Sequence, residues 1–218
     1  MRAVMMPSYI CVKYKVSALT GSSLEVALRL INPEVICMLR CCFAVVALSL
    51  VSHVSIASEG DDQAKSFAKI YASLCLKNLQ NLEALREKLA PLPKLPPEKA
   101  ALFLSGRQGE VWPVPDKHGT FVLTLLTGKN FCAVHARRAN TETAARLFTA
   151  LVANAPSPIT AKLVQDEQRH TAASGTVHTI SYEWSVPNAP RKMLFTITTA
   201  PSESAGLQVL GSAALITP

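Results

Sequence analysis

The sequence has few aromatic and charged residues and no long uninterrupted apolar run. Aromatic residues make up 6% of the 218 residues and charged residues 17%. There is no dense basic run, no series of regularly spaced aromatics and no nucleic-acid-binding motif, so a formal net charge of +7 does not indicate a nucleic-acid partner. No apolar run reaches the roughly 20 residues that a membrane-spanning helix needs. The sequence therefore argues against a nucleic-acid-binding protein and against a membrane-spanning protein.

Patterns typical of several enzyme classes are also missing. No Gly-x-Ser-x-Gly sequence marks a serine nucleophile. The glycines of residues 105–109 lack the spacing and the preceding strand of a phosphate-binding loop. The acidic residues Glu110, Asp116, Glu142 and Asp166 fall on different predicted elements, so no carboxylate pair for glycoside hydrolysis is indicated. We predict no catalytic residue, no metal ligand and no cofactor.

Residues 38–57, MLRCCFAVVALSLVSHVSIA, have the order of features of a secretory signal peptide. Arg40 gives the basic start, an apolar core runs from Phe43 to Val51, and small residues around Ala57 form a cleavage site. We predict that cleavage leaves residues 58–218 as a single mature α+β domain. The signal predicts a periplasmic or secreted protein with no transmembrane span after cleavage.

Residues 1–37 precede this complete signal peptide. Because a signal peptide normally begins at the initiator methionine, we interpret residues 1–37 as an upstream extension and place the start at Met38. The alternative is an extended leader that is removed as well. Cys41 and Cys42 lie before the apolar core, whereas a lipid-bearing cysteine would follow it, so no lipoprotein anchor is indicated.

The predicted mature chain keeps two of the six cysteines, Cys75 and Cys132. Two cysteines in an exported domain most often pair, because the compartment is oxidising. Cys75 falls on the apolar stripe of a predicted helix and Cys132 on the apolar side of a predicted hairpin. If the helix packs on the hairpin, the two can meet. We predict a structural disulfide that stabilises the fold by about 4 kcal/mol on the loop-entropy model.

Apolar residues three and four positions apart predict three helices. The first runs from Gln63 to about Leu89, and a proline-rich run ends it. A short second helix runs from Pro97 to Leu104 and stops at a glycine. The third follows the capping sequence at Asn140 and ends before Pro156.

Alternating apolar residues predict the strands. A four-residue turn after Leu126 places Leu125 opposite Cys132 and Leu123 opposite Val134. Short connections between later strands make those strands antiparallel neighbours. The predicted strands are a run ending at Leu126 and then Phe131–Arg138, Ile159–Thr171, Gly175–Val186, Arg191–Thr199 and Leu207–Ile216. We expect an α+β fold, an antiparallel sheet of about five or six strands with the helices packed on one face.

Two combinations of residues suggest chemistry, and both have a simpler structural explanation. Cys132-x-x-His135 places a thiol near an imidazole, but positions an odd number apart on a strand point to opposite faces. His170 and His178 face each other if five residues join their strands, whereas a four-residue loop pairs Arg169 with His178. Two histidines are too few for a zinc site, which needs three or four ligands.

Residues Phe103–Trp112, Phe131–Arg138 and the helix Ala139–Val152 resemble a family of small exported proteobacterial (lipo)proteins of unknown function. Some members are carried on integrated mobile elements. The resemblance implies export and agrees with the Cys75–Cys132 pair, and it implies no activity.

These observations favour a non-enzymatic periplasmic accessory or binding protein with a periplasmic or envelope protein as partner. Candidate contacts are Arg107 and Trp112 in one turn, where an aromatic can anchor a partner, and Arg137 and Arg138 at the end of a strand. The alternative for Trp112 is a place in the core, and the alternative for the arginine pair is simple exposure to solvent. The alternatives in function are a periplasmic hydrolase, which needs His118 or His135 beside a carboxylate and a hydroxyl in a cleft, and an inhibitor or immunity-type protein with a protruding loop.

Overall fold

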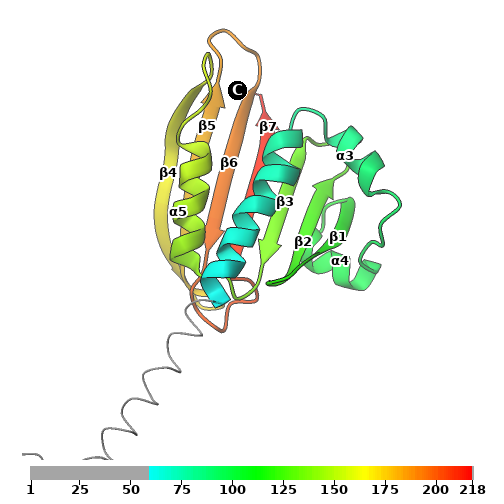
Figure 1. The fold of residues 1–218 in the computed structure, drawn as a ribbon. Coiled ribbons are helices and arrows are strands. Elements are labelled where there is room, and N and C mark those ends of the chain that lie inside the picture. Colours follow the sequence, from blue (N-terminus) through cyan, green and yellow to red (C-terminus); the bar gives the residue numbers. More distant parts are fainter. Residues whose placement is uncertain (1–58, 218) are drawn as a thin grey trace, which may run out of the picture. The chain divides into compact units, whose positions relative to one another are not determined.

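The computed structural model describes residues 59–217, so the predicted signal peptide and residues 1–37 lie outside the described part. Seven strands form one antiparallel sheet in the order β1-β2-β3-β7-β6-β5-β4 (Figure 1). The strands are β1 (Gly109–Asp116), β2 (Gly119–Leu126), β3 (Phe131–Ala136), β4 (Thr160–Thr171), β5 (Gly175–Ser185), β6 (Lys192–Thr199) and β7 (Val209–Ile216). The α+β class is therefore confirmed.

The predicted helix from Gln63 to Leu89 is divided in two. Residues 59–78 are helical and include the π-helical segment η1 (Tyr71–Leu76), and α3 (Leu82–Leu89) follows a short turn. The side chain of Asn81 accepts a hydrogen bond from the Ala84 N–H at 3.2 Å and so begins α3. The apolar spacing alone predicts one helix because the leucines on both sides of the turn face the same core.

Helix 59–78 lies on the central strands of the sheet (Figure 1). A glycine on β7 makes this close approach feasible, since a Cβ on Gly211 would lie 2.6 Å from Cζ of Phe67. The Tyr71 hydroxyl donates to the Ser212 carbonyl at 2.8 Å. Cys75 and Cys132 form a disulfide between this helix and β3, with 5.4 Å between their Cα atoms. The structure thus brings the two predicted partner cysteines together.

The strand register agrees with the sequence at the predicted hairpin. Leu125 pairs with Cys132 and Leu123 with Val134. The sheet has seven strands, whereas about five or six were predicted, because the sequence pattern does not predict β1. β1 contains Pro113 and Pro115, and prolines are tolerated there because β1 is an edge strand.

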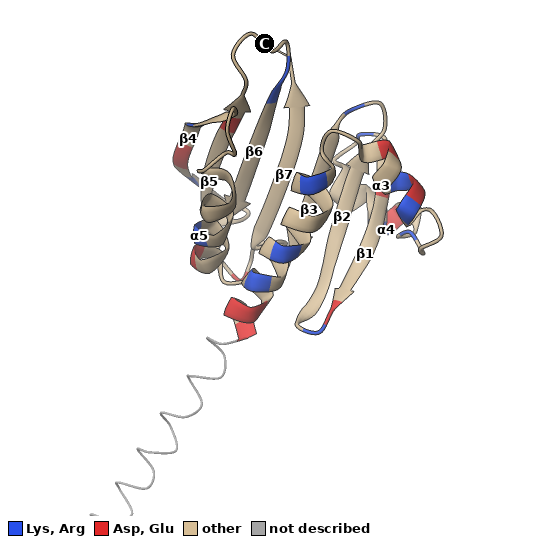
Figure 2. Cartoon of the chain, turned by 45° about the horizontal axis from the view of Figure 1, so that its top comes forward, with Lys and Arg blue, Asp and Glu red and all other residues tan. Residues whose placement is uncertain are grey.

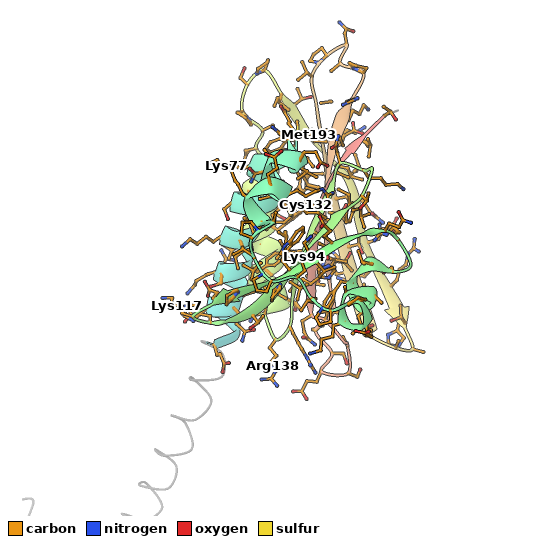
Figure 3. The ribbon with its side chains drawn as sticks, turned by 90° about the vertical axis from the view of Figure 1, so that its right-hand side faces the viewer. Lys77, Lys94, Lys117, Cys132, Arg138 and Met193 are labelled. Carbon is orange, nitrogen blue, oxygen red and sulfur yellow. A yellow bond between two sulfur atoms is a disulfide. The ribbon has the colours of Figure 1, made fainter. Side chains whose placement is uncertain are left out.

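The prediction that all helices pack on one face of the sheet is wrong. Helix 59–78 and α5 (Thr141–Val152) cover one face, which we call the helical face. α4 (Pro97–Leu104) lies against the opposite face, which we call the far face, beside β1 and β2. The edge-on view of Figure 3 separates the two layers. The Leu95 N–H donates to the Val111 carbonyl at 2.8 Å. This bond holds the proline-rich connection against the outer edge of β1, where the chain crosses to the far face.

On the far face, the end of α4 lies beside β5, β6 and β7, where Leu102 and Phe103 line a cavity with Val177 and Leu210. Hydroxyl side chains lie further along the same face of the strands. Ser181 contacts Thr196 at 2.9 Å and donates to the Gln165 side-chain carbonyl at 3.2 Å. Neighbouring positions in the ladder place these three residues in one row across three strands. No helix in the described part is long and apolar enough to span a membrane.

Candidate functional site

Two adjoining cavities lie beside the first half of α5. One has a volume of about 760 Å³ and lies between helix 59–78, the β3–α5 connection and the loop before β7. The other, of about 480 Å³, lies between α5 and strands β4 and β5. Thr141, Glu142 and Pro201 line both cavities. We call the two cavities together the α5 groove.

The α5 groove carries charges of both signs. Arg137 and Arg138 enter it from the β3–α5 connection, Glu142 and Arg146 from α5, and Glu203 from the loop before β7. Figure 3 shows Arg138 at one end of the fold and Met193 at the other. Basic and acidic groups in one groove suit a partner that presents both charges, such as a polypeptide segment.

The connection that carries the arginine pair is held on both sides. The Arg138 N–H donates to the Gln208 side-chain carbonyl at 2.8 Å, and the Asn140 N–H donates to the Gly60 carbonyl at 2.9 Å. The Asn140 side chain accepts from the Thr143 N–H at 3.0 Å, which confirms the predicted cap of α5. Arg138 has a φ of 67°, a left-handed conformation that only a well-determined environment maintains in a residue with a side chain. The backbone therefore presents these arginines in one fixed arrangement.

His178 lines the smaller cavity of the α5 groove. Its Nε2 is 2.6 Å from Oδ1 of Asp166 on the neighbouring strand. Neither register left open by the sequence occurs, because the strands turn through three residues and His178 pairs with Gln168. His170 pairs with Thr176 and so does not face His178. No three His, Cys, Asp or Glu side chains among residues 59–217 are grouped as a metal site would require.

Arg107 and Trp112 lie outside this groove. Arg107 stacks on the Phe131 ring at 5.1 Å, at the opposite end of β3 from Arg137 and Arg138. The Trp112 side chain is 1% exposed and belongs to the core. Trp112 therefore lies in the core, as the alternative interpretation has it, and is not available for contact with a partner. Of the four candidate contacts, only Arg137 and Arg138 lie in the α5 groove.

Cys132 and His135 point to opposite faces, as strand geometry predicts. His135 lies on the far face, 6% exposed, with Nε2 3.1 Å from the Thr124 hydroxyl and its ring against Phe103. Burial, followed by the charge of Arg107, lowers the pKa of His135 to about 4. Its Nδ1 has no partner among the described residues. The histidine is therefore neutral near pH 7, and Cys132 is not a free thiol.

His118 lies near a carboxylate and a hydroxyl, the combination that would favour a hydrolase. The Ser66 hydroxyl donates to Oδ1 of Asp116 at 2.7 Å, and the backbone N–H of His118 donates to the same oxygen at 3.0 Å. These bonds, with that from Ser66 the largest contribution, lower the pKa of Asp116. The serine hydrogen is thus directed at the carboxylate and not at an imidazole. A serine triad requires the imidazole between the other two groups, and this arrangement lacks that order.

The chain matches no protein-family model, and a search of curated proteins finds no significant match to its sequence. The α5 groove could not have been found from the sequence, because its lining comes from segments far apart in the chain. The arginine pair, separated from the Asn140 cap by Ala139, is the one local signal of it.

Proposed function

We propose that this protein is exported across a membrane and acts in the periplasm or outside the cell as a non-enzymatic binding protein. The α5 groove is the proposed binding surface, and a polypeptide segment of a periplasmic or envelope protein is the proposed ligand. The observation that carries the proposal is the meeting of two cavities around Glu142, with arginines and carboxylates along one continuous path. The signal-peptide pattern and the resemblance to exported (lipo)proteins support the compartment.

Buried cysteines support the same compartment. Both are 0% exposed and bonded to each other within the core. A bond of this kind forms most readily where thiols oxidise. We propose that the disulfide forms after export and has a structural role.

The proposal is tested by site-specific photocrosslinking in cells that express the full chain. A photoreactive amino acid replaces Thr149, which lines the groove, and in a control Thr196, which lies on the far face. We expect a defined crosslinked protein from position 149 alone, and we expect Arg146→Glu to abolish it. The same products from both positions, or none from position 149, would contradict the proposal.

A hydrolase is the second candidate, favoured by one observation. The His178–Asp166 pair faces a cavity that is also lined by Thr176 and Thr199, and a carboxylate that orients an imidazole is one part of a general base. Hydrolysis of peptide or ester substrates that is present in the wild type and lost in His178→Ala would favour it.

An inhibitor or immunity-type protein is the third candidate. The connection between β5 and β6, residues 186–191, extends beyond the sheet in Figure 1 and is its proposed contact.

A further inference from the structure

The outer edge of β4 presents backbone groups that can pair with another strand. β4 pairs with β5 on one side only, and residues 166–171 are all exposed. Alternate residues of an edge strand direct their N–H and C=O groups away from the sheet, where they can bind a further strand. The opposite edge is different, because Pro113 and Pro115 of β1 lack the N–H that pairing requires.

A bulge separates β4 into two parts. The register with β5 shifts between Leu163 and Gln165, and it is regular from Gln165 to Thr171, where the turn begins. We call residues Gln165–Thr171 the edge segment. Bulges typically limit pairing at sheet edges, so the edge segment is the part of β4 that can accept a strand over its whole length.

The charges of the edge segment are complementary to themselves in one register. In a two-fold symmetric antiparallel pair the axis passes through one residue, and residues equally distant from it on either side face each other. Centring the pair on Asp166, Glu167 or Arg169 places like charges against each other, which destabilises a sheet. Centring it on Gln168 places Glu167 opposite Arg169 of the second copy.

The same register also pairs the remaining titratable side chains. With Gln168 at the centre, Asp166 faces His170 of the second copy. Asp166 and His170 lie on the helical face, whereas Glu167 and Arg169 lie on the far face, so each face of the joined sheet receives complementary groups. Every cross-strand charge contact in this register is thus attractive or neutral.

These side chains are already arranged for the contact. Arg169 Nη2 lies 3.0 Å from Oε2 of Glu167 within one copy, and their side chains are 78% and 50% exposed. A second copy would add the same pair in reverse order and form a square of alternating charges. Networks of this kind stabilise more than an isolated surface ion pair does.

We propose that two copies of this protein associate through antiparallel pairing of their edge segments, centred on Gln168, so that their sheets join. The inference is independent of the proposed binding function. It also bears on the α5 groove, because Gln168 lines the smaller cavity. Each groove in the dimer would therefore open beside the second copy.

The test uses protein recovered after expression of the full chain and measures its association by analytical ultracentrifugation over a range of concentrations. We expect a wild-type monomer–dimer equilibrium. Glu167→Arg and Arg169→Glu each place like charges opposite each other, and each should raise the dimer dissociation constant at least about tenfold. The double variant E167R/R169E restores opposite charges at both contacts, and its dissociation constant should return to near the wild-type value.

Circular dichroism and thermal unfolding of all four proteins verify that each variant is folded. A wild type that is monomeric at every concentration would overturn the proposal, as would single variants that dimerise as tightly as the wild type. Failure of the double variant to restore the dimer would also overturn it, because rescue is specific to the register centred on Gln168. In a further check, Gln168→Cys should form a disulfide-linked dimer readily and Gln165→Cys should not. Equal crosslinking of both would contradict this register.

Discussion

The ring of Phe103 lies edge-on against the ring of His135, with 5.0 Å between the ring centroids and 72° between the ring planes. This contact joins α4 to the central strand β3 on the face opposite to the disulfide. Helix 59–78 and α4 therefore hold β3 from two sides, the first by a covalent bond and the second by a buried neutral imidazole.

Acidification should destabilise the protein through His135. Its pKa is about 4 in the fold because of burial and the nearby Arg107, against 6.5 for an unperturbed histidine. The unfolded chain therefore binds the proton first as the pH falls. This contribution to stability is complete above about pH 6.5 and is lost as the pH falls to about 4, by roughly 3 kcal/mol in all.

Urea unfolding at a series of pH values measures this effect. His135→Gln keeps a polar group near Thr124 but does not titrate, so the variant should lose less stability than the wild type between pH 6.5 and pH 4. Equal losses in the two proteins would show that another group is responsible.

Phe103→Ala should lower the free energy of unfolding by about 2 kcal/mol, because it removes a half-buried ring from the contact with His135.

Loss of the Cys75–Cys132 bond should destabilise the fold strongly. The bond joins residues separated by 57 positions, and removal of a crosslink of that span corresponds to about 4 kcal/mol of loop entropy. Urea unfolding of the wild type, with and without a reductant, compared with C75A/C132A measures the loss. We expect the reduced wild type and the double variant to be similarly destabilised. A reductant with no effect on the wild type would contradict a disulfide in the purified protein.

The packing of helix 59–78 on β7 should tolerate no side chain at position 211. A Cβ there would lie 2.6 Å from Phe67 Cζ and 3.2 Å from Tyr71 Cδ2. Gly211→Ala should therefore destabilise the protein by about 1–3 kcal/mol, as overpacking does in other cores. Gly206→Ala is the matched control, since a Cβ at Gly206 would have no atom within 4 Å. Thermal unfolding should show a much larger decrease for the first variant, and equal decreases would contradict this packing.

Substitutions of Trp112 should affect stability and leave binding intact. The side chain is buried, so Trp112→Ala should cost about 3–5 kcal/mol. Trp112→Phe should cost less, because Nε1 has no hydrogen-bond partner among residues 59–217. The Trp112→Phe protein should still form the crosslink from position 149. Loss of that crosslink in a folded Trp112→Phe protein would restore Trp112 as a binding residue.

The sequence predicts local structure here better than it predicts how the layers are arranged. The hairpin register follows from the alternation around Leu125 and Cys132 and from a four-residue turn, which are both local properties. The position of α4 depends on which side of β1 the proline-rich connection takes, and the apolar spacing of α4 has no information about that choice. β1 was missed because prolines argue against a strand unless the strand is known to lie at an edge.

The candidate site was accessible from the sequence only in part. Arg137 and Arg138 were recognised as candidate contacts, and they line the larger cavity. The remaining charges reach the groove from α5 and from the loop before β7, and that juxtaposition results from insertion of β7 between β3 and β6. The charged residues, coloured blue and red on the ribbon of Figure 2, are spread over many elements, with acidic residues at 59–62 and basic residues further along the same helix. No run of charge along the chain marks the groove.

The proposed export and the buried disulfide are tested together by the intact mass and N-terminal residue of the protein recovered from cells that express the full chain. We expect the protein in the periplasmic fraction, beginning at Ser58, with a mass two hydrogens below that of the same chain after reduction. A full-length product in the cytosol with both Cys75 and Cys132 open to alkylation after unfolding would contradict the account.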